Sequence, residues 1–288
     1  MLRIKHVLFP VDFSDRCQGA IPFVDQMARR FGAKITLLSV CPPVWYNSLP
    51  DGGAPIVIDE GELRADLEGR LKAFLANDFT GLTVQAIAEL GDPADSITRF
   101  AHTEGVDLIM LPTHGYGPFR RLLLGSVTAK VLHDAQCPVW TGAHMEGPPA
   151  LDHLAGRTVI CAVDATPRSS PLMEWAAEYS KASGASLRLL HVVTGAESWP
   201  ERALDREFEE ALRQQAREAI EKLQRSVGVN APLCIGGGEI ATGVREEAQR
   251  HGADLIVIGR GILHETLGRL RTHAHSIIRQ APCPVISV

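Results

Sequence analysis

The sequence has no long apolar run, and this absence excludes the simplest kinds of membrane protein. None of its 288 residues lies in an apolar stretch approaching the roughly 20 residues that a membrane-spanning helix needs. The N-terminal segment MLRIKHVLFPVDF has an apolar run too short and too interrupted for a signal peptide. We therefore expect a cytoplasmic protein with no membrane partner.

Clustered metal ligands and disulfide patterns are also missing. The six cysteines are scattered, with no CxxC pair: Cys17, Cys41, Cys137, Cys161, Cys234 and Cys283. Such spacing indicates buried thiols in a reducing compartment, without a disulfide framework. His273 and His275 are two apart on an expected helix and point to different faces, and the other histidines form no ligand-spaced set. No metal site is expected.

An excess of positive charge is missing as well. The formal net charge is −5, so nothing in the composition attracts nucleic acid in general. Apolar residues make up 45% and charged residues 22% of the chain, which is typical of globular proteins. A chain of this length is long for one domain and comfortable for two.

Apolar runs alternate with helical patterns along the first half. Strands are expected at 6–12, 34–40, 82–90, 106–112 and 138–141, and helices at 14–31, 60–79, within 91–105 and at 126–133. The Pro-rich and Gly-rich stretch 41–54 is expected to be an exposed loop. This alternation predicts parallel βαβ units in an open sheet that is covered on both faces.

The same series then begins again. HVLFPVD (6–12) is matched by TVICAVD (158–164), and GVDLIML (105–111) is matched by GADLIVI (252–258). Further matched pairs are GAKITLLSV (32–40) with GASLRLLHV (184–192), GDPADSI (91–97) with GEIATGV (238–244), and QCPV (136–139) with PCPV (282–285). A repeat this long is a duplicated domain. The expected domains are 1–145 and 155–288, joined by a linker rich in glycine and proline.

The stretch LPTHGYGPFRRLLLGSV (111–127) has the parts of a phosphate site. A strand ends near Leu111, a loop with glycines follows, and Gly125-Ser126 opens a helix. Backbone N–H groups in such a loop and at a helix N-terminus bind anions without any catalytic side chain.

The order of these motifs resembles a tandem universal stress protein over essentially the whole chain. The resemblance rests on the repeat, VDFSD at the start, GDPA, DLI, the HG…LLLGSV loop and the CPV endings. It implies an α/β fold of two flavodoxin-like (Rossmann-like) domains, of the adenine nucleotide alpha hydrolase-like type, each with an open five-stranded parallel sheet and helices on both faces. It also implies that the last strands, at 138–141 and 284–288, pair about a pseudo-two-fold axis within the chain.

Many members of this family bind ATP, so the resemblance implies an adenine nucleotide as ligand, with Mg²⁺ only as its counter-ion. Carried over to this chain, Asp12 and Val40 flank the adenosine. Residues of the glycine loop and the helix start would then bind the ribose and phosphates: Thr113, His114, Gly115, Gly125, Ser126 and Val127. Simpler roles stay open, since Asp12 and Ser126 are also suited to capping helices, and His114 to facing solvent.

Both loops depart from the family's pattern. Pro112 stands at the first loop glycine and brings no N–H group, which removes about 1.5–3 kcal/mol if that group bonded a phosphate. Gly117 and Arg120-Arg121 are candidates to compensate in part. The second loop, GRGILHETLGRLRT (259–272), is one residue shorter, with Arg271 at the position of Gly125. We therefore expect the first domain to bind nucleotide and the second to be degenerate.

The predicted function is that of a stress-response regulatory protein that binds ATP or a related adenine nucleotide. No general base stands near the expected γ-phosphate, so no catalytic residues are assigned and the protein is not expected to be an enzyme. The alternative is a nucleotide-independent interaction protein of the same fold. A protein partner and a homo-oligomer remain open, and no nucleic-acid partner is expected.

Overall fold

The computed structural model describes residues 2–42, 60–75, 78–113, 124–142, 157–194, 203–260 and 269–288. Strands and helices alternate in the first half, with the bounds β1 (His6–Pro10), α1 (Asp15–Phe31), β2 (Lys34–Cys41), α2 (Glu60–Leu75), β3 (Val84–Leu90), α3 (Pro93–Thr103), β4 (Leu108–Pro112), α4 (Ser126–Asp134) and β5 (Val139–Gly142). The second half repeats the series as β6 (Thr158–Ala162), the short 3₁₀ helix η1 (Pro167–Ser169), α6 (Ser170–Ser183), β7 (Ser186–Val193), α7 (Ala203–Val227), β8 (Leu233–Gly237), α8 (Ile240–Arg250), β9 (Leu255–Ile258), α9 (Arg269–Gln280) and β10 (Val285–Ser287).

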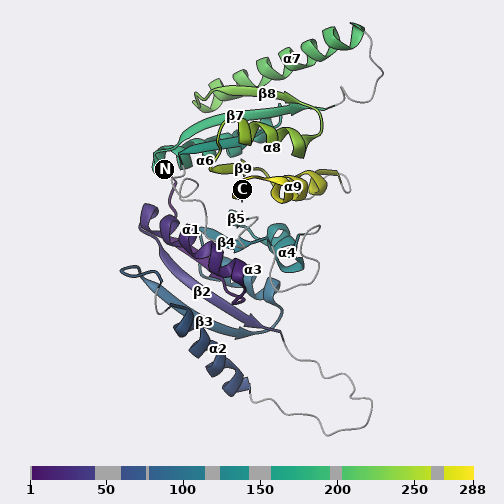
Figure 1. The fold of residues 1–288 in the computed structure, drawn as a ribbon. Coiled ribbons are helices and arrows are strands. Elements are labelled where there is room, and N and C mark those ends of the chain that lie inside the picture. Colours follow the sequence, from purple (N-terminus) through teal and green to yellow (C-terminus); the bar gives the residue numbers. More distant parts are fainter. Residues whose placement is uncertain are drawn as a thin grey trace, which may run out of the picture.

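The strands form one continuous sheet across both halves, as Figure 1 shows. Among the described residues this sheet has 10 strands in the order β3-β2-β1-β4-β5-β10-β9-β6-β7-β8. Each half contributes five strands that are parallel to one another. The predicted fold class, two doubly wound α/β domains related by duplication, is confirmed.

The two halves meet at an antiparallel pair, β5 with β10. Val285 lies opposite Thr141, Ile286 opposite Trp140, and Ser287 opposite Val139. The pairing of the last strands within one chain, which the resemblance implied, is therefore confirmed. Trp140 is 2% exposed at this junction, and Ile286 is fully buried.

Helices cover both faces of the sheet. One core layer joins β-strand residues to α1, α2, α6 and α7, through residues that include Cys17, Leu71, Met173 and Ile220. The opposite layer joins the sheet to α3, α4, α8 and α9, through residues that include Ile97, Val131, Val244 and Ile278. Along the described segments, no helix combines the length and the apolar character that crossing a membrane requires.

The aspartate of each DLI motif has the same structural role in both halves. Asp107 Oδ2 accepts hydrogen bonds from the backbone N–H groups of Lys5 (2.7 Å) and His6 (2.9 Å). Asp254 Oδ2 accepts the equivalent bonds from Arg157 (2.7 Å) and Thr158 (3.0 Å). The carboxylate thus satisfies N–H groups at the start of the first strand of each half, which explains why the repeat keeps it.

Several element ends differ from the prediction. The first strand ends at Pro10 and not at residue 12, because Phe13 has a left-handed φ of 62° that turns the chain toward α1. Helix α2 ends at Leu75 and not at residue 79. Cys41, expected to begin the loop at 41–54, is the last residue of β2 and lies opposite Leu90 of β3. From position 43 onward, that loop lies outside the described residues.

The histidine at the start of β1 should make stability depend on pH. His6 is 3% exposed, with Nε2 2.8 Å from Thr36 Oγ1. Burial, and then the charge of Lys34, lower the pKa of His6 below its ordinary value of 6.5. The unfolded chain then binds a proton that the folded protein does not, so stability should fall as pH drops below 6.5.

Replacing His6 by glutamine should flatten this acid limb, as measured by urea denaturation between about pH 7 and about pH 5. The matched control is His102→Gln, because His102 is exposed in α3. A His6→Gln protein that keeps the wild-type slope would show that another group titrates in this range.

Candidate functional site

The predicted ligand crevice lies where the sheet changes its winding direction. From β1 the chain moves outward to β2 and β3, and it then returns to the other side of β1 with β4 and β5. In such sheets ligands bind outside the carboxyl ends of the strands at this switch point, here between β1 and β4. Asp12 follows β1 and Thr113 follows β4, while Val40 is the penultimate residue of the neighbouring β2. The structure therefore brings these three predicted residues to one edge of the sheet.

The start of α4 is held against the end of β4 by two hydrogen bonds. The Gly125 backbone N–H donates to the Thr113 carbonyl (2.9 Å), and Thr128 Oγ1 donates to the Pro112 carbonyl (3.1 Å). Val127 is half-buried and packs against the core layer of α3 and α4. These contacts place the N-terminus of α4 beside the crevice.

Among the described residues, no side chain caps the N-terminus of α4. The N-cap residue is Gly125, with φ −57° and ψ 143°, and it makes no side-chain capping bond. The alternative that Ser126 is the N-cap is therefore wrong. The cap is the residue before it, and Ser126 is the first residue of the helix and is exposed. By contrast, Ser14 caps α1 and Asp92 caps α3 with side-chain oxygens. A helix N-terminus without a side-chain cap is suited to water or to an anion.

Asp12 does not cap helix α1 itself, which was the alternative role expected from the sequence. Its Oδ1 accepts hydrogen bonds from the Ser14 backbone N–H (3.0 Å) and the Ser14 hydroxyl (2.7 Å). Ser14 Oγ in turn accepts from the Cys17 backbone N–H (3.2 Å), so the helix cap is Ser14 and Asp12 orients it. Asp12 is nevertheless exposed, in the loop that follows β1.

Pro112 and Thr113 are built into the sheet. Pro112 is the last residue of β4 and lies opposite Gly142, so the position needs no left-handed backbone. Thr113 is 4% exposed, and both its backbone N–H (3.0 Å) and its hydroxyl (3.3 Å) donate to the Gly142 carbonyl. The side chain of Thr113 therefore serves the β4–β5 junction. The predicted contacts of His114 and Gly115, and the compensating roles of Gly117 and Arg120-Arg121, lie outside the described residues.

The second half uses the matching position for a contact between the halves. Gly259 and Arg260 follow β9 as Pro112 and Thr113 end β4, and the Arg260 backbone N–H donates to the Val288 carbonyl (3.1 Å). The guanidinium donates across the junction to the carbonyls of Ala135 (2.6 Å) and Cys137 (2.9 Å). Burial lowers the pKa of Arg260 below its ordinary value.

The contact of Arg260 with Ala135 also caps the C-terminus of α4, where a cation is favoured by the helix dipole. Sequence reasoning missed this role, because nothing in the loop pattern says which carbonyls a long side chain reaches. The side chains of Arg271 and Thr272 are outside the described part of the structure. That Arg271 makes the second loop unable to bind nucleotide therefore stays a prediction.

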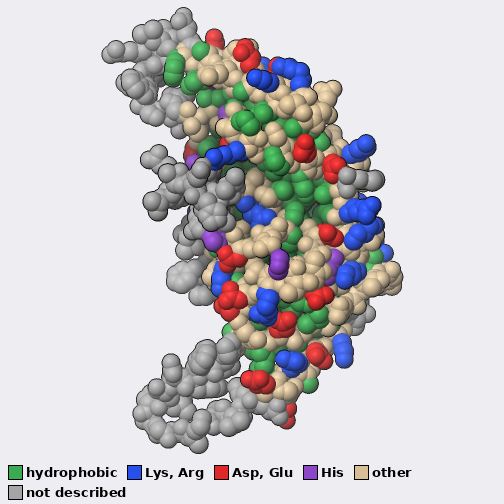
Figure 2. Space-filling view, turned by 180° about the vertical axis from the view of Figure 1, so that it is seen from behind, with side chains coloured by type: hydrophobic (Ala, Val, Ile, Leu, Met, Phe, Trp, Pro, Cys, Tyr) green, Lys and Arg blue, Asp and Glu red, His purple; other side chains and the backbone are tan. Residues whose placement is uncertain are grey.

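A cavity of about 580 Å³ lies beside the predicted site, between α4 and α9. Its lining includes Ser126, Lys130 and His133 from α4, together with Arg260 and the α9 residues His275 and Ile278. Lys130 is already paired with Asp95 (2.6 Å) and Asp92 (3.3 Å). On the face that Figure 2 shows, acidic and basic side chains are interspersed and form no single patch of one sign.

The fold defines the class: a tandem, doubly wound α/β protein whose two halves share one sheet. The family model described as the universal stress protein family matches residues 3–141 and again residues 156–288. The chain belongs to the universal stress protein family, with two copies of the family's domain.

Individual relatives agree with this assignment. A universal stress protein of Methanocaldococcus jannaschii is 30% identical over 135 residues, which are 47% of this chain and 79% of the relative. One of Thermus aquaticus is 31% identical over 137 residues, 47% of this chain and 96% of the relative. The crystal structure of a universal stress protein from Archaeoglobus fulgidus covers 99% of this chain and 96% of its own, with a TM-score of 0.68 at 21% identity. At that identity the last comparison supports the two-domain fold alone.

Proposed function

We propose that the N-terminal half binds ATP, or a related adenine nucleotide, in the crevice between β1 and β4. The observation that carries the proposal is the uncapped N-terminus of α4, fixed at the end of β4 by the bond from Gly125 N–H to the Thr113 carbonyl. A helix N-terminus in this position is suited to the negative charge of phosphates. Mg²⁺ enters only as the counter-ion of the nucleotide.

The proposed output is regulatory: the nucleotide changes the conformation or the partner contacts of the protein during a stress response, without multiple turnover. Asp12, the carboxylate that directly follows β1, is engaged with Ser14. A carboxylate held by two donors is a weak candidate for a general base. The protein acts in the cytoplasm in this proposal, and its protein partner is unidentified.

A second candidate function is a nucleotide-independent interaction protein of the same fold. Two observations favour it: Pro112 has no N–H group to offer, and the hydroxyl of Thr113 donates to the Gly142 carbonyl within the sheet. The two functions are separated by isothermal titration of ATP into nucleotide-free protein, with GTP as the comparison. If the purified protein carries no nucleotide and ATP gives no heat, the nucleotide proposal fails.

Replacing Pro112 by glycine should strengthen ATP binding about ten- to hundredfold, because it restores one backbone N–H group worth about 1.5–3 kcal/mol to a charged acceptor. The dissociation constant from the same titration is the measurement. Pro138→Gly is the control, since Pro138 also adjoins the β4–β5 pair but lies just before β5, at the end opposite to Pro112. Equal affinities for Pro112→Gly and wild type would mean that this position makes no phosphate contact.

A further inference from the structure

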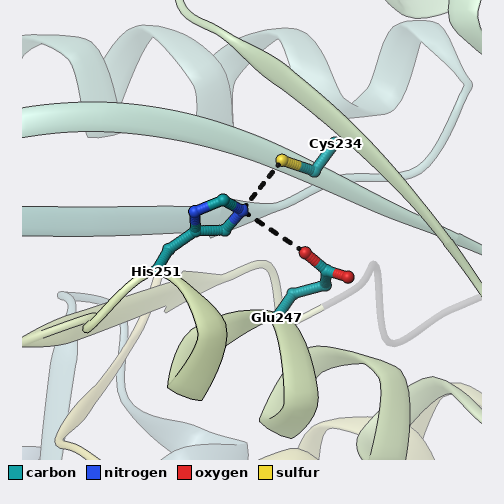
Figure 3. A group of neighbouring side chains, drawn as sticks. All are labelled: Cys234, Glu247 and His251. Carbon is teal, nitrogen blue, oxygen red and sulfur yellow. Dashed lines mark hydrogen bonds and ion pairs between the residues drawn. The ribbon is translucent and has the colours of Figure 1, made fainter.

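A cysteine, a glutamate and a histidine converge in the second half, away from the proposed nucleotide crevice. Cys234 lies on β8, the edge strand of the sheet, and Glu247 and His251 lie one turn apart at the C-terminal end of α8. Figure 3 shows all three side chains pointing toward one another, with His251 Nε2 between the other two. One ligand atom from each residue lies within 4.8 Å of the others.

The two distances made by His251 Nε2 match edges of a coordination tetrahedron. His251 Nε2 is 3.5 Å from Cys234 Sγ and 3.4 Å from Glu247 Oε2. For Zn²⁺ with bonds of about 2.3 Å to sulfur and about 2.0–2.1 Å to nitrogen or oxygen, tetrahedral angles separate ligand atoms by about 3.4–3.6 Å. Two of the three separations therefore suit a bound metal ion, and the third, from Cys234 Sγ to the Glu247 carboxylate, is within 4.8 Å.

The charges and the surroundings suit a divalent ion. A thiolate and a carboxylate together neutralise a charge of +2, and the imidazole binds as a neutral ligand. Glu247 is 9% exposed, and Cys234 packs against the core layer of α8 and α9. The other carboxylate oxygen, Glu247 Oε1, accepts a hydrogen bond from Arg250, which fixes the orientation of Oε2 toward the cluster.

The first half provides an internal comparison for the same places in the fold. By the offset that relates Asp107 to Asp254, Cys234 corresponds to Ile87 and Glu247 to Phe100. Ile87 and Phe100 are both partly buried hydrophobic residues that pack against the core layer of α3 and α4. Packing alone is thus satisfied by apolar side chains at these positions, and the second half has ligand types at both of them as well as at His251.

We propose that Cys234, Glu247 and His251 bind a divalent transition metal of the Zn²⁺ type, with water in the fourth position. The ion joins the edge strand β8 to the end of α8. A soft thiolate with an imidazole and a carboxylate selects Zn²⁺ over Mg²⁺ or Ca²⁺. No metal site is expected from the sequence, because the fold alone brings Cys234 next to the histidine and glutamate of another element.

The test uses the full chain, reduced and freed of metal by a chelator, with Co²⁺ as a spectroscopic probe and Zn²⁺ in competition. One equivalent of Co²⁺ should give a thiolate-to-cobalt charge-transfer band with the strong visible absorption of tetrahedral cobalt. Cys234→Ser should abolish the charge-transfer band, and His251→Gln should lower Zn²⁺ affinity at least about tenfold. Cys41→Ser is the matched control, because Cys41 is also a half-buried thiol near the end of a strand.

Absence of a thiolate band in the wild-type protein, or a band that survives in Cys234→Ser, would overturn the proposal. A second experiment uses the wild-type chain, so it tests the site even if a variant does not fold. Zn²⁺ should slow alkylation of Cys234 at least about tenfold and leave that of Cys41 unchanged, as quantified by peptide mass spectrometry. Equal alkylation of Cys234 with and without Zn²⁺ would also refute the site.

Discussion

Replacing Trp140 by alanine is expected to lower the free energy of unfolding by about 3–5 kcal/mol, the usual cost of removing a buried tryptophan. Trp140 is 2% exposed, and its ring centroid lies 5.3 Å from that of Phe23. It also stands on β5 opposite Ile286 of β10 and beside Tyr179, so one side chain packs against both halves. The substitution should therefore destabilise both halves together.

The measurement is urea denaturation followed by circular dichroism, with Trp175→Ala as the matched control. Trp175 is half-buried in α6 and stacked on Tyr179, with ring centroids 5.3 Å apart, and it does not lie on the β5–β10 strand pair. Its removal should cost about 1–2 kcal/mol, since less surface is lost from the core. A Trp140→Ala protein that is as stable as Trp175→Ala would contradict the role given to the junction.

Replacing Gly125 by arginine is expected to weaken ATP binding at least about a hundredfold, or about 2.7 kcal/mol. The change gives the first loop the residue found at the corresponding place of the second, Arg271. A long side chain at the N-cap of α4 occupies the space in which the proposed phosphates meet the helix N-terminus. The expectation rests on the proposed function.

The backbone conformation of Gly125 allows other residues at this position without strain. Gly125 has φ −57°, a value that any residue adopts, so the arginine adds no backbone strain. Gly125→Ala is the control and should cost much less affinity, and the thermal midpoint of both variants without nucleotide should stay near that of the wild type. If Gly125→Arg binds ATP as the wild type does, the nucleotide does not lie at this helix N-terminus.

Much of the fold could be predicted from the sequence, because each half repeats the same hydrophobic and turn signals. The DLI motif shows why such a repeat is informative: Asp107 and Asp254 make equivalent bonds to the first strands of their halves. The ends of elements were less accurate, as at Pro10, where the backbone of Phe13 and not the apolar pattern ends the strand. Apolar periodicity reports burial, and it does not report a change of φ.

The candidate site was predictable only in part. The places of Asp12, Val40 and Thr113 follow from the topology, since the carboxyl ends of neighbouring parallel strands share one edge. The partners of individual side chains do not follow from it: Asp12 holds Ser14, and Thr113 bonds Gly142. Such contacts depend on rotamers and loop paths, which spacing in the sequence does not encode. The reach of Arg260 across the junction was unpredictable for the same reason.

The antiparallel pair of β5 and β10 links two halves that belong to a single chain. Tethering keeps the two strands at an effective concentration on the order of millimolar, so dilution does not separate them. Each half then always meets the same partner, and selection for self-complementary binding sites is relaxed. One half is free to use Thr113 within its own sheet, while the other uses the matching position, Arg260, to hold the pair together. Covalent linkage thereby turns a symmetric assembly into one whose two sides can specialise.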